Sequence, residues 1–152
     1  MESRLTHEFE RYYGIVFTSL FEEVSDVRIK KISDNDSAYV LNNRLGLYIK
    51  HTTARISPWS YSFRTNDFAV IDQLELETTE IAFGLVCGFH GVCLISSQDL
   101  KVAGGVFQGD ALRITVRTMR GGSWKVSGTA GELSTTRSKT KPWERFQDFL
   151  LA

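Results

Sequence analysis

The stretch SAYVLNNRLGLYIKHTTARISPWSYSF, residues 37–63, decides the fold that this sequence predicts. Two short apolar segments, Ala38 to Leu41 and Leu45 to Lys50, flank the pair Asn42-Asn43. Asparagine tolerates the positive φ that a two-residue hairpin turn requires. The sequence therefore predicts a β-hairpin at this position.

The second strand of this hairpin has two different faces, because side chains alternate along a strand. The apolar residues from Leu45 to Ile49 at every second position share one face, and Tyr48 and Lys50 share the other. Aromatic residues alternate again between Trp59 and Phe63. This second alternation predicts a further strand after Pro58.

Upstream of the hairpin, aromatic and aliphatic residues recur every three or four positions from Thr6 to Glu23, which predicts an amphipathic helix with Thr6 as its N-cap. The elements predicted elsewhere are strands over Val27 to Ile32, Ile81 to Val86, Val92 to Ile95, Leu112 to Arg117 and Trp124 to Ser127, and helices over Asp67 to Glu77 and Asp99 to Val102. Thr65 or Asn66 is the predicted N-cap of the first of these helices, and Ser96-Ser97 that of the second. The segment 129–141, rich in Ser, Thr and Lys, is predicted to be a mobile loop, and Pro142 opens a final amphipathic segment.

This order predicts one domain over residues 1–152, with a mixed α/β fold of the α+β kind. One central mixed β-sheet is flanked by helices, with the amphipathic helix at the N-terminus and an antiparallel hairpin near the C-terminus. The run from Ile81 to Val86 is almost continuously apolar, which is typical of a central strand buried on both faces.

The composition is that of a globular domain, with 152 residues, 42% of them apolar and 24% charged. No apolar run approaches the roughly 18 residues of a membrane helix. The charged start MESRLTHEFER lacks the apolar core of a signal peptide, and the chain has two cysteines. We therefore expect a cytoplasmic protein without a membrane partner. The oligomeric state stays open, with a homodimer among the alternatives.

The formal net charge is zero, but the charges are unevenly distributed along the chain. Residues 44–64 carry four basic side chains and no acidic one, whereas residues 65–80 carry five acidic side chains and no basic one. Residues 111–141 carry seven basic side chains and one acidic one. If the two basic segments share a face, that face could bind a phosphate backbone. The candidate polyanion-binding residues are Arg44, Arg55, Arg64, Arg113, Arg117, Lys125, Arg137 and Lys139.

The order helix, hairpin, helix, buried strand resembles the PD-(D/E)XK nuclease superfamily over residues 6–95. In that superfamily an Asp before one strand and an (Asp/Glu)-x-Lys motif in the next hold a divalent metal and an attacking water. The resemblance implies Asp36 as the first acid, Lys50 as the lysine and Glu10, or the nearby Glu8, as the helix acid, with Mg²⁺ as cofactor in that case alone. This chain departs from the motif because Tyr48 stands where the second carboxylate belongs, and a phenol with a pKa near 10 is no substitute for it.

Two further strings, LYIKHTTARISPWSYSF and FGLVCGFHGVCLIS, resemble a family of small uncharacterised bacterial proteins. Members of that family carry IKxxTxRxSPWxFxF, LVCGxxGxC and GGSWxVSG-like segments. The resemblance covers residues 36–128 and implies element boundaries without an activity.

Cys87, His90 and Cys93 have the residue types of a zinc site, but three ligands within seven residues are too local without a distant fourth. Their flanks are those of buried strands, in which a free cysteine behaves as a small apolar side chain. We predict no metal centre at this position.

Three functions remain open. The first is a non-catalytic, degenerate nuclease-like module that binds nucleic acid or another polyanion without a cofactor, and we expect this one. If Trp59 and Tyr61 are exposed beside the basic residues, they could add base stacking to such a binding surface. The alternative is that both residues lie in the core. The second is a metal-dependent nuclease using Asp36, Lys50 and Glu10. The third is a protein-interaction or small-ligand module.

Overall fold

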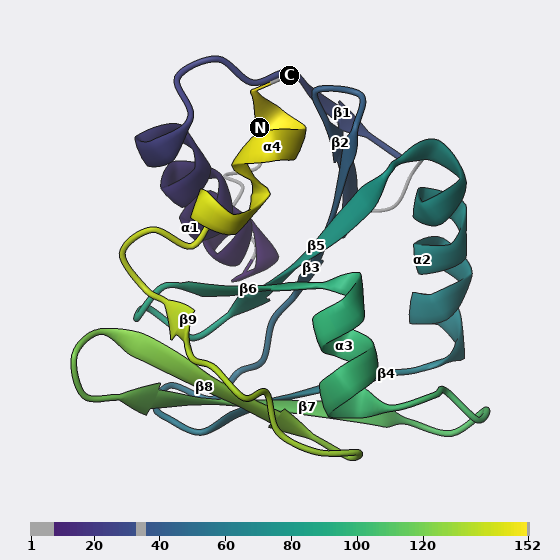
Figure 1. Ribbon diagram of the computed structural model, residues 1–152, viewed down its shortest axis with the longest axis vertical. Helices are drawn as coiled ribbons and strands as arrows, with labels where there is room; N and C mark the ends of the chain where they lie inside the picture. Colours follow the sequence, from purple (N-terminus) through teal and green to yellow (C-terminus); the bar gives the residue numbers. More distant parts are fainter. Residues whose placement is uncertain (1–7, 33–35, 152) are drawn as a thin grey trace, which may run out of the picture.

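The computed structural model describes residues 8–32 and 36–151 (Figure 1). Its elements are α1 (Glu8–Glu23), β1 (Ile29–Lys31), β2 (Ala38–Leu41), β3 (Leu45–Lys50), β4 (Trp59–Phe63), α2 (Thr65–Glu77), β5 (Glu80–Val86), β6 (Val92–Ser96), α3 (Ser97–Gly104), β7 (Leu112–Met119), β8 (Ser123–Gly128), β9 (Arg137–Ser138), the 3₁₀ helix η1 (Glu144–Phe146) and α4 (Gln147–Leu150). None of the described helices combines the length and the apolarity that crossing a bilayer requires.

The first sheet, sheet A, has five strands in the order β1-β2-β3-β5-β6 and is mixed, as predicted. Strands β3 and β5 are parallel, and the other neighbours are antiparallel. The hairpin of β2 and β3 has the predicted boundaries, and Asn42 and Asn43 adopt positive φ angles of 51° and 59°. Leu41 pairs with Leu45, so the loop contains three residues, Asn42, Asn43 and Arg44, instead of the two of the predicted turn.

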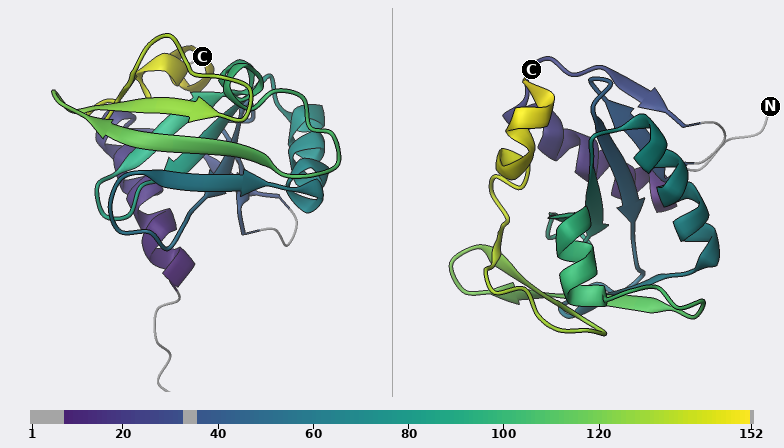
Figure 2. Two further views of the ribbon diagram at one scale, coloured as in Figure 1. Left: turned by 90° about the horizontal axis from the view of Figure 1, so that it is seen from below. Right: turned by 45° about the vertical axis from the view of Figure 1, so that its right-hand side comes forward.

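Each face of sheet A is covered by a separate apolar layer. Helix α1 and the C-terminal η1 and α4 cover one face, whereas α2 covers the other beside sheet B (Figures 1 and 2). Strand β5 is buried along almost its whole length, which confirms the prediction from its continuous apolar run. The layer under α1 contains Leu45, Leu47 and Ile49, and the opposite layer contains Tyr48.

A second sheet, sheet B, is antiparallel and has the order β4-β7-β8-β9. Strand β4 leaves sheet A after β3 and pairs with β7 from Trp59↔Val116 to Phe63↔Leu112. The predicted C-terminal hairpin therefore forms a sheet of its own together with β4. The three alternating aromatic residues of β4, Trp59, Tyr61 and Phe63, are buried in the apolar layer between the two sheets.

Helix boundaries differ from the prediction by up to two residues. Helix α2 begins at Thr65 and its N-cap is Arg64, so the predicted caps Thr65 and Asn66 lie inside the helix. The Asp67 carboxylate accepts the Arg64 N–H at 2.8 Å, which supplies the cap from within the first turn. Ser96 caps α3 as predicted, accepting the Asp99 N–H at 3.1 Å. The predicted cap Thr6 lies outside the described residues.

The segment 129–141, predicted from its composition to be a mobile loop, contains strand β9 and two buried side chains, Leu133 and Arg137. Beyond it, Trp143, Phe146 and Leu150 pack under α1 as the amphipathic pattern predicts. The indole N–H of Trp143 donates to the Ser19 hydroxyl at 2.9 Å. This contact fastens the C-terminal segment to α1.

Candidate polyanion interface

The outer face of sheet B is the side turned away from the apolar layer, and no other helix or strand of the described residues covers it in the view from below (Figure 2, left). Strands β4, β7 and β8 alternate strictly between buried apolar and exposed or half-buried polar residues for most of their length. We define the outer face by its polar side chains, which are Ser60, Ser62, Arg64, Arg113, Thr115, Arg117, Lys125 and Ser127. Arg64 belongs to it because its extended backbone (φ −116°, ψ −177°) continues the alternation of β4.

The strand register places these side chains next to one another in rows. Ser60 pairs with Thr115 across β4 and β7, with their hydroxyls 3.2 Å apart, and Thr115 pairs with Ser127 across β7 and β8. Arg113 lies opposite Ser62, and Arg117 lies opposite Lys125. The face therefore presents a central row of hydroxyls with a basic residue on each side.

The charge of this face is mostly unneutralised. Lys125 forms an ion pair with Glu132 at 3.3 Å, in which both side chains are about half exposed. Among the residues that the structure describes, Arg113 and Arg117 have no ion-pair partner. Two exposed arginines that are not consumed by the fold remain available to a ligand.

The other predicted basic residues are not part of this face. Arg44 lies in the β2–β3 turn of sheet A, with its guanidinium 6.0 Å from the Phe149 ring. Arg55 is exposed in the loop before β4, and Lys139 lies 4.4 Å from the ring of the buried Trp124. The two basic segments thus share a face only in part, through Arg64, Arg113, Arg117 and Lys125.

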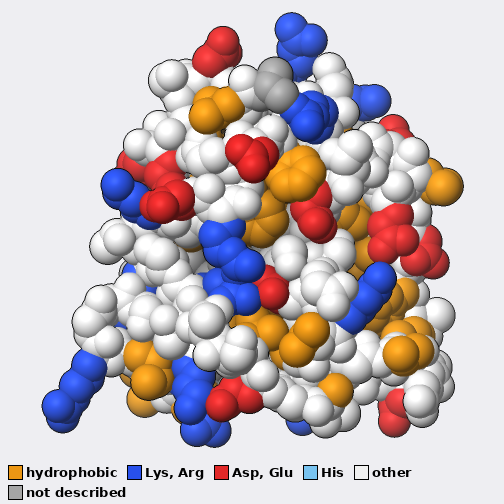
Figure 3. Space-filling view, viewed as in Figure 1, with side chains coloured by type: hydrophobic (Ala, Val, Ile, Leu, Met, Phe, Trp, Pro, Cys, Tyr) orange, Lys and Arg blue, Asp and Glu red, His pale blue; other side chains and the backbone are white. Residues whose placement is uncertain are grey.

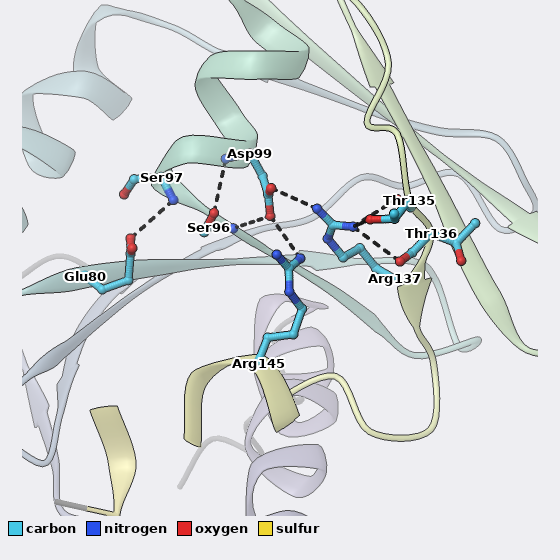
Figure 4. A network of polar contacts seen from close by, with 8 residues as sticks. All are labelled: Glu80, Ser96, Ser97, Asp99, Thr135, Thr136, Arg137 and Arg145. Carbon is cyan, nitrogen blue, oxygen red and sulfur yellow. Dashed lines mark hydrogen bonds and ion pairs between the residues drawn. The ribbon is translucent and has the colours of Figure 1, made fainter. Parts of the chain in front are cut away.

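Arg137, the remaining member of the predicted set, is 6% exposed and is occupied by internal contacts (Figure 4). Its Nη2 donates to Asp99 at 2.8 Å, and its Nη1 donates to the hydroxyl of Thr135 at 2.8 Å. Arg145, half exposed, donates to the second oxygen of the same carboxylate at 3.3 Å. Arg137 is therefore a structural residue that joins β9 to α3.

The two aromatic side chains that were candidates for a stacking surface point away from the outer face, into the apolar layer. Trp59 and Tyr61 are 0% and 2% exposed and lie in the apolar layer between the sheets. Of the two alternatives, an exposed stacking platform and a core, the structure shows the core. The outer face consequently offers charge and hydroxyl groups but no ring for a base to stack on.

Asp36 and Lys50, two residues of the nuclease-like constellation, have different ionic partners. Lys50 points toward α2, where its Nζ lies 3.2 Å from both oxygens of Asp67. Asp36 is exposed and bonds Lys31, and Glu10 lies on α1, against the opposite face of sheet A. The bond from the Ile49 N–H to the Ser37 carbonyl at 2.8 Å continues the register of β2 and β3, so Asp36 and Lys50 are the next residues across this pair, although their side chains bind Lys31 and Asp67.

The carboxylate beside Lys50 comes from the first turn of α2 instead of from β3. Asp67 also accepts the Tyr48 hydroxyl at 2.5 Å and, as noted, the Arg64 N–H. Burial and the bond to this carboxylate raise the pKa of Tyr48 well above its usual value, so the phenol stays protonated and donates. The sequence reasoning missed Asp67, although an acid at the third position of a helix is a known capping signal.

Cys87 and Cys93 are free, buried thiols, as the flanking strands predicted. His90 is exposed and its ring lies 5.4 Å from the Trp59 ring. The part of the chain that the structure describes contains no group of three His, Cys, Asp or Glu residues placed to hold a metal ion.

Comparisons with protein-family models, with curated proteins and with solved structures found no match for this chain.

Proposed function

We propose that this protein is a non-catalytic module that binds a nucleic acid, or another extended polyanion, on the outer face of sheet B. The observation that carries the proposal is the placement of Arg113 and Arg117 on one open sheet face without ion-pair partners among the described residues. Arg64 and Lys125 extend the positive charge toward α2 and β8.

The spacing of the two arginines suits a chain of phosphates. They are four residues apart on one strand and therefore about 13 Å apart along it, at about 3.3 Å per residue. Each guanidinium can bind a different phosphate with two parallel hydrogen bonds. Between them, Ser60, Thr115 and Ser127 supply hydroxyls, which are common partners of phosphate and sugar oxygens.

Recognition on such a face is directed at the backbone of the ligand. Since Trp59 and Tyr61 are buried, bases have no exposed ring of β4 to stack on. Contacts made by charge and hydroxyl groups alone position a nucleic acid without reading its sequence. We therefore expect binding that is independent of sequence and strongly dependent on salt.

The cluster at Lys50 favours this function over a metal-dependent nuclease. A carboxylate has about four acceptor sites. In Asp67 these are occupied by the Tyr48 hydroxyl, by Lys50 on both oxygens and by the Arg64 N–H. The arrangement stabilises the junction between β3 and α2 and leaves this carboxylate little capacity for a cation.

Fluorescence anisotropy with labelled DNA and RNA, single-stranded and duplex, tests the proposal. Arg64, Arg113 and Arg117, the three cations of this face without an ion pair among the described residues, predict a slope of about −3 in a plot of log K against log salt for duplex DNA, measured between about 50 and 200 mM salt. Labelled heparin serves as a polyanion without bases. The absence of binding to all of these probes at low salt, or binding that salt does not weaken, would contradict the proposal.

The matched variants are Arg113→Ala combined with Arg117→Ala, and Arg44→Ala as a control in the turn of sheet A. The double variant should weaken binding by about tenfold at low salt and reduce the salt slope by about two, because two phosphate contacts are lost. Arg44→Ala should leave both quantities nearly unchanged. Equal effects of the two changes would show that the outer face is not the binding surface.

A further inference from the structure

A cleft of about 330 Å³ lies between α2 and α3, on the inner side of sheet B. Its walls are apolar and include Phe68 and Ile71 from α2, Leu100 from α3, and Phe83 and Leu112 from the two sheets. Leu112 is buried and points away from the outer face, so this cleft is a separate site. Hydrophobic side chains gather between α2 and α3 in the space-filling view (Figure 3).

The rim of the cleft is charged, and its two sides differ. Asp72 and Glu75 stand on α2, and Lys101 stands on α3. Within the described part of the chain, none of these three side chains has a hydrogen bond or an ion pair. The rim therefore carries two carboxylates and one ammonium group, a net negative charge, next to an apolar floor.

The loop from Gly105 to Asp110 closes one end of the cleft. Gly105 and Gly109 have φ angles of 84° and 85°, a conformation that favours glycine and lets the loop turn sharply at both points. Between them Phe107 stacks on Phe68, with ring centroids 4.4 Å apart and an interplanar angle of 27°. The cleft thus already holds one aromatic ring in stacked geometry against α2.

We propose that this cleft binds a small aromatic molecule that carries a positive charge. Its volume lies at the lower end of the range for small-molecule pockets, which suits one or two fused rings. The ring would lie on the apolar floor beside the stacked Phe68 and Phe107, and the cation would face the carboxylates of Asp72 and Glu75. An anion of the same shape would meet two like charges at this rim and is disfavoured.

Three indoles of matched ring and different charge test this inference by ¹⁵N- and ¹³C-edited NMR titration. These are tryptamine, a cation, indole, which is neutral, and indole-3-acetate, an anion. Tryptamine should shift the signals of Phe68, Phe83 and Phe107, and should bind about threefold to tenfold more tightly than indole-3-acetate. The inference is overturned if tryptamine at about 10 mM shifts none of these signals, or if the anion binds equally well.

Substitutions of exposed residues test which charges of the rim select the ligand, without disturbing the core. Glu75→Gln should weaken tryptamine binding and leave indole unchanged, and Lys101→Gln should strengthen tryptamine binding, because it removes the one cation at the rim. Glu77→Gln is the matched control, since Glu77 is on the same helix but does not line the cleft and lies 3.8 Å from Lys30. If Glu75→Gln and Glu77→Gln have the same effect on tryptamine, the proposed orientation is wrong.

Discussion

The guanidinium of Arg137 donates a hydrogen bond to the carboxylate of Asp99 at 2.8 Å, although 38 residues separate them in the chain. Both residues are buried, with exposed fractions of 6% and 8%. Asp99 lies in the first turn of α3, where its other oxygen accepts the Ser96 N–H at 3.0 Å. A single ion pair thus connects the N-terminus of α3 to the C-terminal strand β9 (Figure 4).

Replacing Asp99 should cost more stability than replacing Arg145, its half-exposed partner. In Asp99→Asn the Arg137 guanidinium keeps its charge in a buried position without a counter-ion, and we expect a loss of about 3 kcal/mol in the free energy of unfolding. Arg145→Ala removes a contact of a half-exposed side chain and should cost less than about 1 kcal/mol. Urea denaturation of the three proteins measures both values. Equal losses would contradict a dominant role of the Arg137–Asp99 pair.

Because of the Arg137–Asp99 pair, the free energy of unfolding should depend on pH in the acid range. Although burial alone would raise it, hydrogen bonds from Ser96 and Arg137, together with the arginine charges, hold the pKa of Asp99 below its usual value of 3.8. A carboxyl group with a lowered pKa in the folded state stabilises the fold above its unfolded pKa, and this contribution is lost as the pH falls through the folded pKa. The difference in unfolding free energy between wild type and Asp99→Asn should therefore be constant from neutral pH to about 5 and shrink below about 4. A difference that stays constant down to pH 3 would refute the assignment.

Tyr48→Phe should destabilise the junction of β3 and α2 while leaving its packing intact. The variant removes the donor to the Asp67 carboxylate and keeps the ring against Phe83, so we expect a loss of about 1 to 2 kcal/mol. Tyr39→Phe is the control, because its hydroxyl bonds the exposed Asp36 carbonyl and should be worth less than about 0.5 kcal/mol. Chemical denaturation compares them, and a larger effect of Tyr39→Phe would be inconsistent with the Asp67 cluster.

Both cysteines should be unreactive in the native protein. Burial raises the pKa of the Cys87 thiol to about 12 and that of Cys93 well above its usual value, so little thiolate forms at neutral pH. Reaction with a disulfide reagent such as DTNB should be slow in buffer and complete for two thiols in denaturant. Rapid labelling of either thiol without denaturant would show that this part of the core opens readily.

Two glycines should respond in opposite directions to the same substitution. A β-carbon at Gly14, inside α1, meets nothing within 4 Å, so Gly14→Ala should stabilise the protein by about 0.8 kcal/mol through helix propensity. A β-carbon at Gly128 would lie 2.5 Å from the carbonyl oxygens of Ala103 and Arg113, so Gly128→Ala should be strongly destabilising. Thermal unfolding midpoints that move in the same direction for both variants would contradict the close packing of β8 against α3 and β7.

Local sequence patterns were sufficient to predict most helices and strands of this fold. The Asn42-Asn43 turn, the alternation in β3 and the continuous apolar run of β5 each act over a few residues, and the structure has the predicted hairpin and central strand. For the same reason the cap of α3 at Ser96 was predictable. The cap of α2 was not, because Arg64 is an unusual residue at that position and the side chain that satisfies its N–H is Asp67.

The candidate site depended on pairing between distant segments. Alternation in β4 and β7 predicts that each strand has a polar side, but the pairing of Ser62 with Arg113 follows only from the register between them. The sequence could not distinguish Arg113 from Arg137, since both lie in polar, basic segments. The tertiary structure separates them, because β7 turns Arg113 toward solvent whereas β9 turns Arg137 toward Asp99.

By itself, then, the sequence determined a mixed sheet with helices on its faces, because hydrophobic periodicity and turn residues act locally. Only the tertiary structure decided that β4 leaves sheet A to form a second sheet with the C-terminal hairpin, and which basic side chains reach the surface together. The physical reason is that side-chain alternation fixes which face of a strand is buried, whereas the sheet that a strand joins depends on pairing between residues far apart in the chain, such as Trp59 with Val116.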